Sequence, residues 1–80
     1  MDIAPSRPAI LCRADLVRAM AADLTRYDAF RDPDDAFRSL YAVRDAHGVQ
    51  RYSAFQIGTC LEDAIAVAFQ DVVAREMAGS

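Results

Sequence analysis

Thr59 and Glu62 form the pattern of a capping box, which comes just before an apolar run over residues 65–69. In this motif the threonine hydroxyl accepts from the backbone N–H three residues on, and the glutamate carboxylate accepts from the threonine N–H. The motif predicts a C-terminal helix from about Cys60 to Met77. Its expected core stripe consists of Leu61, Ile65, Ala68, Phe69 and Val72.

Between Phe37 and Ile57 the apolar residues recur at every second position, around a turn at Ala46-His47-Gly48. A three-residue loop that ends in a left-handed glycine is typical of a β-hairpin with a bulge. The expected register pairs residue 45 with 49 and 43 with 51, and continues to 37 with 57. The apolar odd-numbered face comprises Phe37, Tyr41, Val43, Val49, Phe55 and Ile57. The even-numbered face comprises Arg38, Leu40, Ala42, Arg44, Gln50, Tyr52, Ala54 and Gln56.

Before the hairpin, a helical spacing of apolar residues predicts a first helix over about residues 13–27. Its stripe consists of Leu16, Met20, Leu24 and Tyr27, whereas Arg18, Asp23 and Arg26 fall on the solvent side. Pro33 disfavours helical geometry at the residue before it. We therefore expect Asp32 to cap a short helical turn that begins at Pro33.

Together these elements predict an α+β domain over residues 13–80: a helix, an antiparallel β-hairpin and a second helix, with both helices on the odd face of the sheet. Residues 1–12, broken by Pro5 and Pro8, form a leader that could add an edge strand. A chain of 80 residues makes one domain that buries roughly 60–65% of its unfolded surface, so a homodimer would add stability.

The charge balance bears on the class of partner. The chain has 9 basic and 12 acidic residues, which gives a net charge of −3. Proteins that bind nucleic acid through its phosphates are normally basic, so we expect no direct nucleic-acid binding. The chain has no apolar run of about 18 residues, and the first residues lack the apolar region of a signal peptide. These features predict a cytoplasmic protein without a membrane partner.

Cys12 and Cys60 lack the paired spacing of a zinc site. In a cytosolic chain they are interpreted most simply as free thiols that fill small apolar spaces. Each is expected at the start of a helix, where the pKa of a thiol can be lowered. Whether either one is reactive or disulfide-bonded stays open at this point.

No pattern typical of catalysis accompanies these cysteines. His47 lies in the expected turn, and no Ser, Thr or Cys has an evident base beside it. The acidic run over residues 28–35 contains Pro33 and lacks the glycine that a calcium loop needs. We therefore predict a protein without catalytic residues, cofactor or metal. A small enzyme that uses Cys60 or His47 is the least favoured alternative.

Two surfaces are candidates for binding a protein partner. One is an acidic loop formed by Asp32, Asp34 and Asp35. The other is the even face of the hairpin, where an aromatic, an aliphatic and two arginine side chains combine types that are enriched at interfaces. Its residues are Arg38, Leu40, Arg44 and Tyr52.

In its size, mild acidity, compact α+β layout and lack of catalytic residues, the chain resembles the small anti-CRISPR proteins of phages and mobile elements. The resemblance implies an inhibitor that docks on a CRISPR effector such as the Cascade complex and blocks its binding to target DNA. Asp32, Asp34 and Asp35 would then oppose cations that normally hold nucleic acid. The alternative is an antitoxin-like or regulatory subunit that buries its hairpin or its C-terminal helix in a cognate protein.

Overall fold

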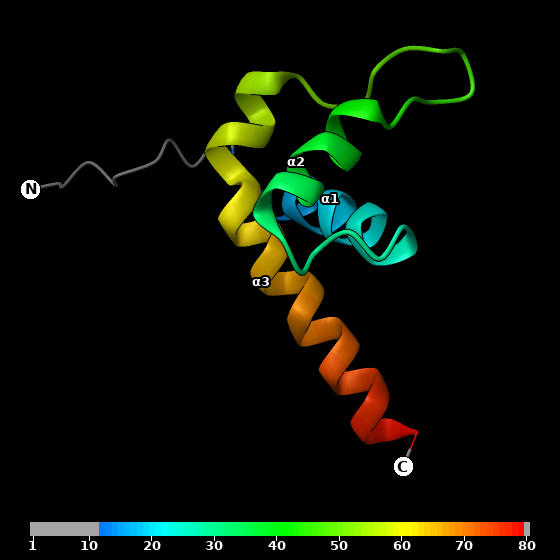
Figure 1. Cartoon of the computed structure of the whole chain (residues 1–80), viewed down its shortest axis with the longest axis vertical. Helices are drawn as coiled ribbons and strands as arrows, with labels where there is room; N and C mark the ends of the chain where they lie inside the picture. The colour runs from blue at the N-terminus through cyan, green and yellow to red at the C-terminus, as the bar shows by residue number, and fades with distance from the viewer. Residues whose placement is uncertain (1–11, 80) are drawn as a thin grey trace, which may run out of the picture.

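The computed structural model describes residues 12–79, which form three α-helices and no strand (Figure 1). They are α1 (Ala14–Arg26), α2 (Pro33–Ala42) and α3 (Ala54–Ala78). α1 and α2 pack against the N-terminal part of α3, whose orange-to-red end extends past them (Figure 1). The prediction of an α+β fold is therefore wrong: the described chain is built of helix on helix. Of the expected leader over residues 1–12, all but Cys12 lies outside the described residues.

The first predicted helix is confirmed, but it is rotated about its axis relative to the expected stripe. The side chains of α1 that are buried belong to Val17, Met20, Ala21, Asp23 and Leu24. Leu16 is only half-buried, and Tyr27, which caps the end of α1, is exposed. Asp23, which was expected in solvent, lies inside the molecule. The physical consequence is a carboxylate in the core, which needs partners there.

α2 begins as predicted and ends later. The Asp32 side chain accepts a hydrogen bond from the backbone N–H of Asp34 at 3.0 Å, and Pro33 occupies the first turn. The helix then continues to Ala42, because Ala36 and Leu40, one turn apart, are both buried. A spacing of four residues satisfies a helix and an alternating strand equally well, which is why this segment was misread as a strand.

The predicted turn is formed, but the hairpin around it is not. Gly48 has a φ of 80°, and the backbone N–H of Asp45 donates to the carbonyl of Val49 at 2.9 Å. The N–H of Arg51 donates to the carbonyl of Val43 at 3.3 Å, in the expected register. Pairing stops at a single bridge between Arg44 and Gln50. On both sides of the bridge the chain enters a helix, so the prediction of two long strands is wrong.

The start of α3 corrects the predicted cap. Ser53 is the N-cap: its hydroxyl accepts from the N–H of Gln56 at 3.1 Å, and the Gln56 side chain accepts from the N–H of Ser53 at 2.9 Å. Thr59 and Glu62 lie within the helix instead of at its start. Ser53 and Gln56 have the spacing of a capping box just as Thr59 and Glu62 do, and the earlier pair is the one that the fold uses.

The core takes residues from both predicted faces of the hairpin, since Val43 and Ile57 of the apolar odd face are buried as expected. Leu40 and Tyr52, assigned to the polar even face, are 0% and 4% exposed. Tyr41, Val49 and Phe55, assigned to the apolar odd face, are exposed. Many core residues are small, including four alanines. The buried apolar residues are Val17, Met20, Ala21, Leu24, Phe30, Ala36, Leu40, Val43, Tyr52, Ile57, Cys60, Ala64 and Ala68.

Cys12 and Cys60 form a disulfide, with their Cα atoms 5.6 Å apart. The interpretation of both as free thiols is therefore wrong. The bond ties the chain just before α1 to the buried face of α3. Since disulfides persist mainly in oxidising compartments, this bond does not favour the predicted cytoplasmic location.

The corrected cap leads to a paired prediction. Ser53→Ala should lower the free energy of unfolding by about 1 kcal/mol, because it removes the side-chain acceptor at the helix start. Thr59→Ala, a matched change inside the same helix, should cost less than half as much. Urea titrations of both variants measure this, and a larger loss for Thr59→Ala would contradict the observed helix start.

Reduction of the disulfide should destabilise the domain. The bond joins residues separated by 48 positions, and closing a loop of that length restricts the unfolded chain by about 4 kcal/mol in the chain-entropy model. Urea unfolding with and without a dithiol reductant measures the difference. The Cys12→Ala/Cys60→Ala variant should lose its response to the reductant, whereas equal midpoints for the reduced and oxidised wild type would contradict the prediction.

Candidate functional site

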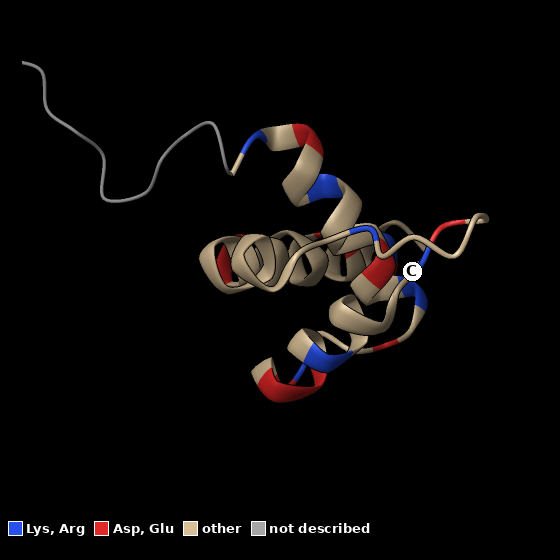
Figure 2. Ribbon diagram, turned by 90° about the horizontal axis from the view of Figure 1, so that it is seen from above, with Lys and Arg blue, Asp and Glu red and all other residues tan. Residues whose placement is uncertain are grey.

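The predicted acidic surface exists at the start of α2, and its side chains have structural duties there. Asp32 caps the helix, and the Asp35 carboxylate pairs with Arg38 at 2.6 Å. Asp34 is exposed beside them. Acidic side chains in the first turn stabilise a helix through its dipole. Figure 2 shows that acidic and basic positions are interspersed along the ribbon of the described residues, without a large field of one sign.

The structure does not bring together the predicted even face. Leu40 and Tyr52 are in the core, whereas Arg38 and Arg44 are exposed on and just after α2. Arg44 Nη1 donates to the carbonyl of Gly48 at 3.0 Å and so stabilises the turn. These four residues therefore form no common surface for a partner.

A buried polar group centred on Asp23 was not predicted from the sequence. Asp23 is 2% exposed, and the Tyr52 hydroxyl donates to its Oδ2 at 2.6 Å. Arg51 Nη1 lies 3.3 Å from Oδ1 and 3.2 Å from Oδ2. A buried carboxylate is costly unless it is paired and hydrogen-bonded. The side chains of Tyr52 and Arg51 supply these partners to Asp23, and so link α1 to the residues that lead into α3.

The tyrosine of this group is held in its neutral form. Burial raises the pKa of Tyr52 well above its ordinary value, and both the hydrogen bond to Asp23 and the negative charge of that carboxylate raise it further. The positive charges of Arg51 and Arg26 oppose this rise only in part. A buried, protonated phenol that donates to a carboxylate is suited to holding helices together, and it offers no base or nucleophile to a substrate.

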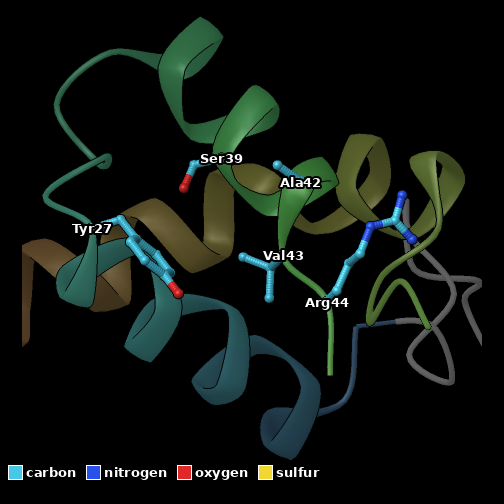
Figure 3. A pocket seen from close by; sticks show the side chains of 5 residues that line it. All are labelled: Tyr27, Ser39, Ala42, Val43 and Arg44. Atoms are coloured by element: carbon cyan, nitrogen blue, oxygen red, sulfur yellow. The ribbon is translucent and has the colours of Figure 1, made fainter. Parts of the chain in front are cut away.

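Between the C-terminal ends of α1 and α2 lies an open pocket of about 280 Å³ (Figure 3). Figure 3 shows the Tyr27 ring across from Val43, while the Arg44 side chain points away from it. No charged group that lines the pocket is directed into it, so it lacks the convergent polar groups of a typical ligand site. Its lining consists of Tyr27, Ser39, Ala42, Val43 and Arg44.

Other residues considered for chemistry are not assembled into a site. His47 is exposed in the turn, where its backbone N–H donates to Asp45 Oδ1 at 2.8 Å. Within residues 12–79, no three or more His, Cys, Asp or Glu side chains are placed to hold a metal ion. Cys60, the expected alternative nucleophile, is in the disulfide.

Three exposed apolar side chains follow one another along the C-terminal end of α3. We call Phe69, Val73 and Met77 the α3 stripe; they are 41%, 49% and 73% exposed. They line a shallow groove of about 390 Å³, together with Gln70 and Ala74. Successive members are four residues apart and so share one face of the helix. Phe69 was predicted to lie in the core, so its partial exposure, and with it the whole stripe, is a finding of the structure.

Aromatic contacts anchor the α3 stripe where it meets the body of the molecule. The Phe69 ring packs edge-to-face on Phe30, with centroids 5.0 Å apart. The Arg31 guanidinium lies over the ring of Phe30, 4.8 Å from its centroid. Phe30 is buried, so Phe69 is held in place while part of its surface remains accessible. Beyond it, Val73 and Met77 continue the stripe.

The chain matches no protein family, no curated protein and no solved structure. Among the described helices, none combines the length and the apolar character needed to cross a membrane. The α3 stripe is therefore the candidate functional surface on the strength of its own geometry.

The buried polar group predicts a dependence of stability on alkaline pH. Because folding raises the pKa of Tyr52, its stabilising contribution is complete below about pH 10, the ordinary tyrosine pKa, and is lost as the pH rises beyond it. Tyr52→Phe should lower the free energy of unfolding by about 1–3 kcal/mol at pH 7, since Asp23 loses a buried hydrogen bond. It should also reduce the loss of stability that the wild type shows at alkaline pH.

Urea titrations between pH 7 and about 11 measure this effect. Tyr27→Phe is the matched control, because Tyr27 is exposed. An alkaline fall in Tyr52→Phe as steep as in the wild type would contradict the assignment.

Proposed function

We propose that this chain is a small non-enzymatic binding protein that docks on a larger protein assembly through the α3 stripe. The observation that carries the proposal is the exposure of Phe69, Val73 and Met77 along one face of a helix end that extends past α1 and α2 (Figure 1). Burying a large apolar side chain contributes up to about 1.5–3 kcal/mol. Contiguous exposed apolar surface of this kind is typical of an interaction site.

The positions of the chemically versatile side chains support a binding role. Asp23 and Tyr52 serve the core, and Cys60 is buried in a disulfide. Of the exposed acids at the start of α2, Asp32 caps that helix and Asp35 pairs with Arg38. The α3 stripe, by contrast, has no duty within the fold that requires Val73 and Met77 to be large and apolar.

The class of target stays a prediction. An anti-CRISPR block of an effector complex would use Asp32, Asp34 and Asp35 against cations that hold nucleic acid. An antitoxin-like or regulatory subunit would bury α3 in its cognate protein. The exposed stripe favours contact through α3, and variants of the two surfaces separate the alternatives.

The test is quantitative co-purification from bacteria that carry a CRISPR system, with cross-linking and mass spectrometry. Val73→Asp should reduce capture of the specific partner by at least about tenfold, because a charge would be buried in the apolar contact. Val49→Asp is the matched control: it makes the same change at an exposed valine in the turn. Circular dichroism confirms that each variant keeps its helices.

The double variant Asp34→Arg/Asp35→Arg tests the acidic surface in the same assay. We expect it to retain the partner. If it loses the partner while Val73→Asp keeps it, the α3 stripe is not the docking site and the acidic start of α2 takes its place.

A further inference from the structure

The spacing of exposed residues along α3 indicates the shape of what binds there. Positions 62, 66, 69, 73 and 76 follow one another at intervals of four, three, four and three, and all are exposed. This alternation has the spacing of the a/d seam in a two-stranded coiled coil, in which the partner is another α-helix. We call these positions the α3 seam; they are Glu62, Ala66, Phe69, Val73 and Glu76.

The charges of the seam indicate the chemistry of that helix. Phe69 and Val73 form its apolar middle, and Glu62 and Glu76 lie at its ends, about 21 Å apart along the helix. Glu76 also takes part in an interaction within the chain, so Glu62 is expected to contribute most to the selection of a partner. A carboxylate at the end of an apolar seam favours a partner with lysine or arginine at the facing position.

A second copy of this chain does not place a lysine or arginine opposite Glu62 and Glu76. In a parallel pair each glutamate would face its own counterpart, and like charges in an interface are repulsive. In the antiparallel register that pairs Phe69 with Val73, Glu76 would face Ala66 of the other copy, without an opposite charge. The seam contains no cation, and Arg75, two residues beyond Val73, lies on the other side of the helix.

We infer that the α3 seam binds an amphipathic helix of another protein, with an apolar ridge that packs on Phe69 and Val73 and basic side chains that face Glu62 and Glu76. This inference rests on the proposed function, because the α3 seam shares Phe69 and Val73 with the α3 stripe and the inference names the class of partner that binds there. It describes a heteromeric two-helix contact in which apolar packing supplies affinity and the glutamates select the charge of the partner.

The test uses two synthetic helical peptides, each labelled with a fluorophore. Both carry leucine at the a and d positions that would face Phe69 and Val73; at the a and d positions that would face Glu62 and Glu76, one peptide carries lysine and the other carries glutamate. Fluorescence anisotropy with the oxidised full chain should show the lysine peptide binding at least about tenfold more tightly, with a preference that shrinks as salt is added.

Two variants with equal changes in charge locate the selectivity. Glu62→Lys should reduce the preference for the lysine peptide to less than about threefold, because it removes the facing carboxylate. Asp71→Lys makes the same change at an exposed position on the opposite side of α3, and should keep the preference. Val73→Asp should abolish the binding of both peptides.

Equal affinity for the two peptides, binding of neither, or equal effects of Glu62→Lys and Asp71→Lys would each overturn the inference. Sedimentation that shows a dimer of the wild type, lost in Val73→Asp, would overturn it as well, since the occupant would then be a second copy. If the peptides fail while Val73→Asp still loses the cellular partner, the proposed function stands without this inference. If Val73→Asp keeps that partner, the proposed function itself fails.

Discussion

The carboxylate of Asp23 is the constraint on which the arrangement of the helices depends. It lies in the core, where its charge requires partners, and it finds them in the side chains of Tyr52 and Arg51. These two residues immediately precede the N-cap of α3. The pairing therefore sets where α3 begins relative to α1, and the direction of the whole long helix follows from that start.

A second tie lies a short distance along the same helix. The disulfide joins Cys60 to the residue that precedes the N-cap of α1, and the small side chains of Ala64 and Ala68 let helices approach closely on the same face of α3. No residue of α3 beyond Ala68 is buried among those described. The N-terminal part of α3 is thus firmly held, whereas its end is left to present the α3 stripe.

The candidate site could be predicted from the sequence only in part. The caps and ion pairs at the acidic start of α2 depend on neighbours along the chain, so the role of Asp32 as the N-cap could be predicted correctly. Asp23 was missed because a shift of about one position in the buried stripe of α1 moves it from solvent to core. The α3 stripe was missed because periodicity shows that a helix has an apolar face, but not how far the neighbouring helices extend along it.

The sequence by itself determined the local structure: the helix α1, the cap at Asp32 and the left-handed glycine at Gly48. Each rests on interactions within a few residues, which the order of amino acids specifies directly. Only the tertiary structure decided that residues 37–42 and 54–57 are helical, since apolar residues four positions apart share one face of a strand and of a helix alike. It also decided that Cys12 meets Cys60, because the distance between remote residues depends on how the helices pack and not on their separation along the chain.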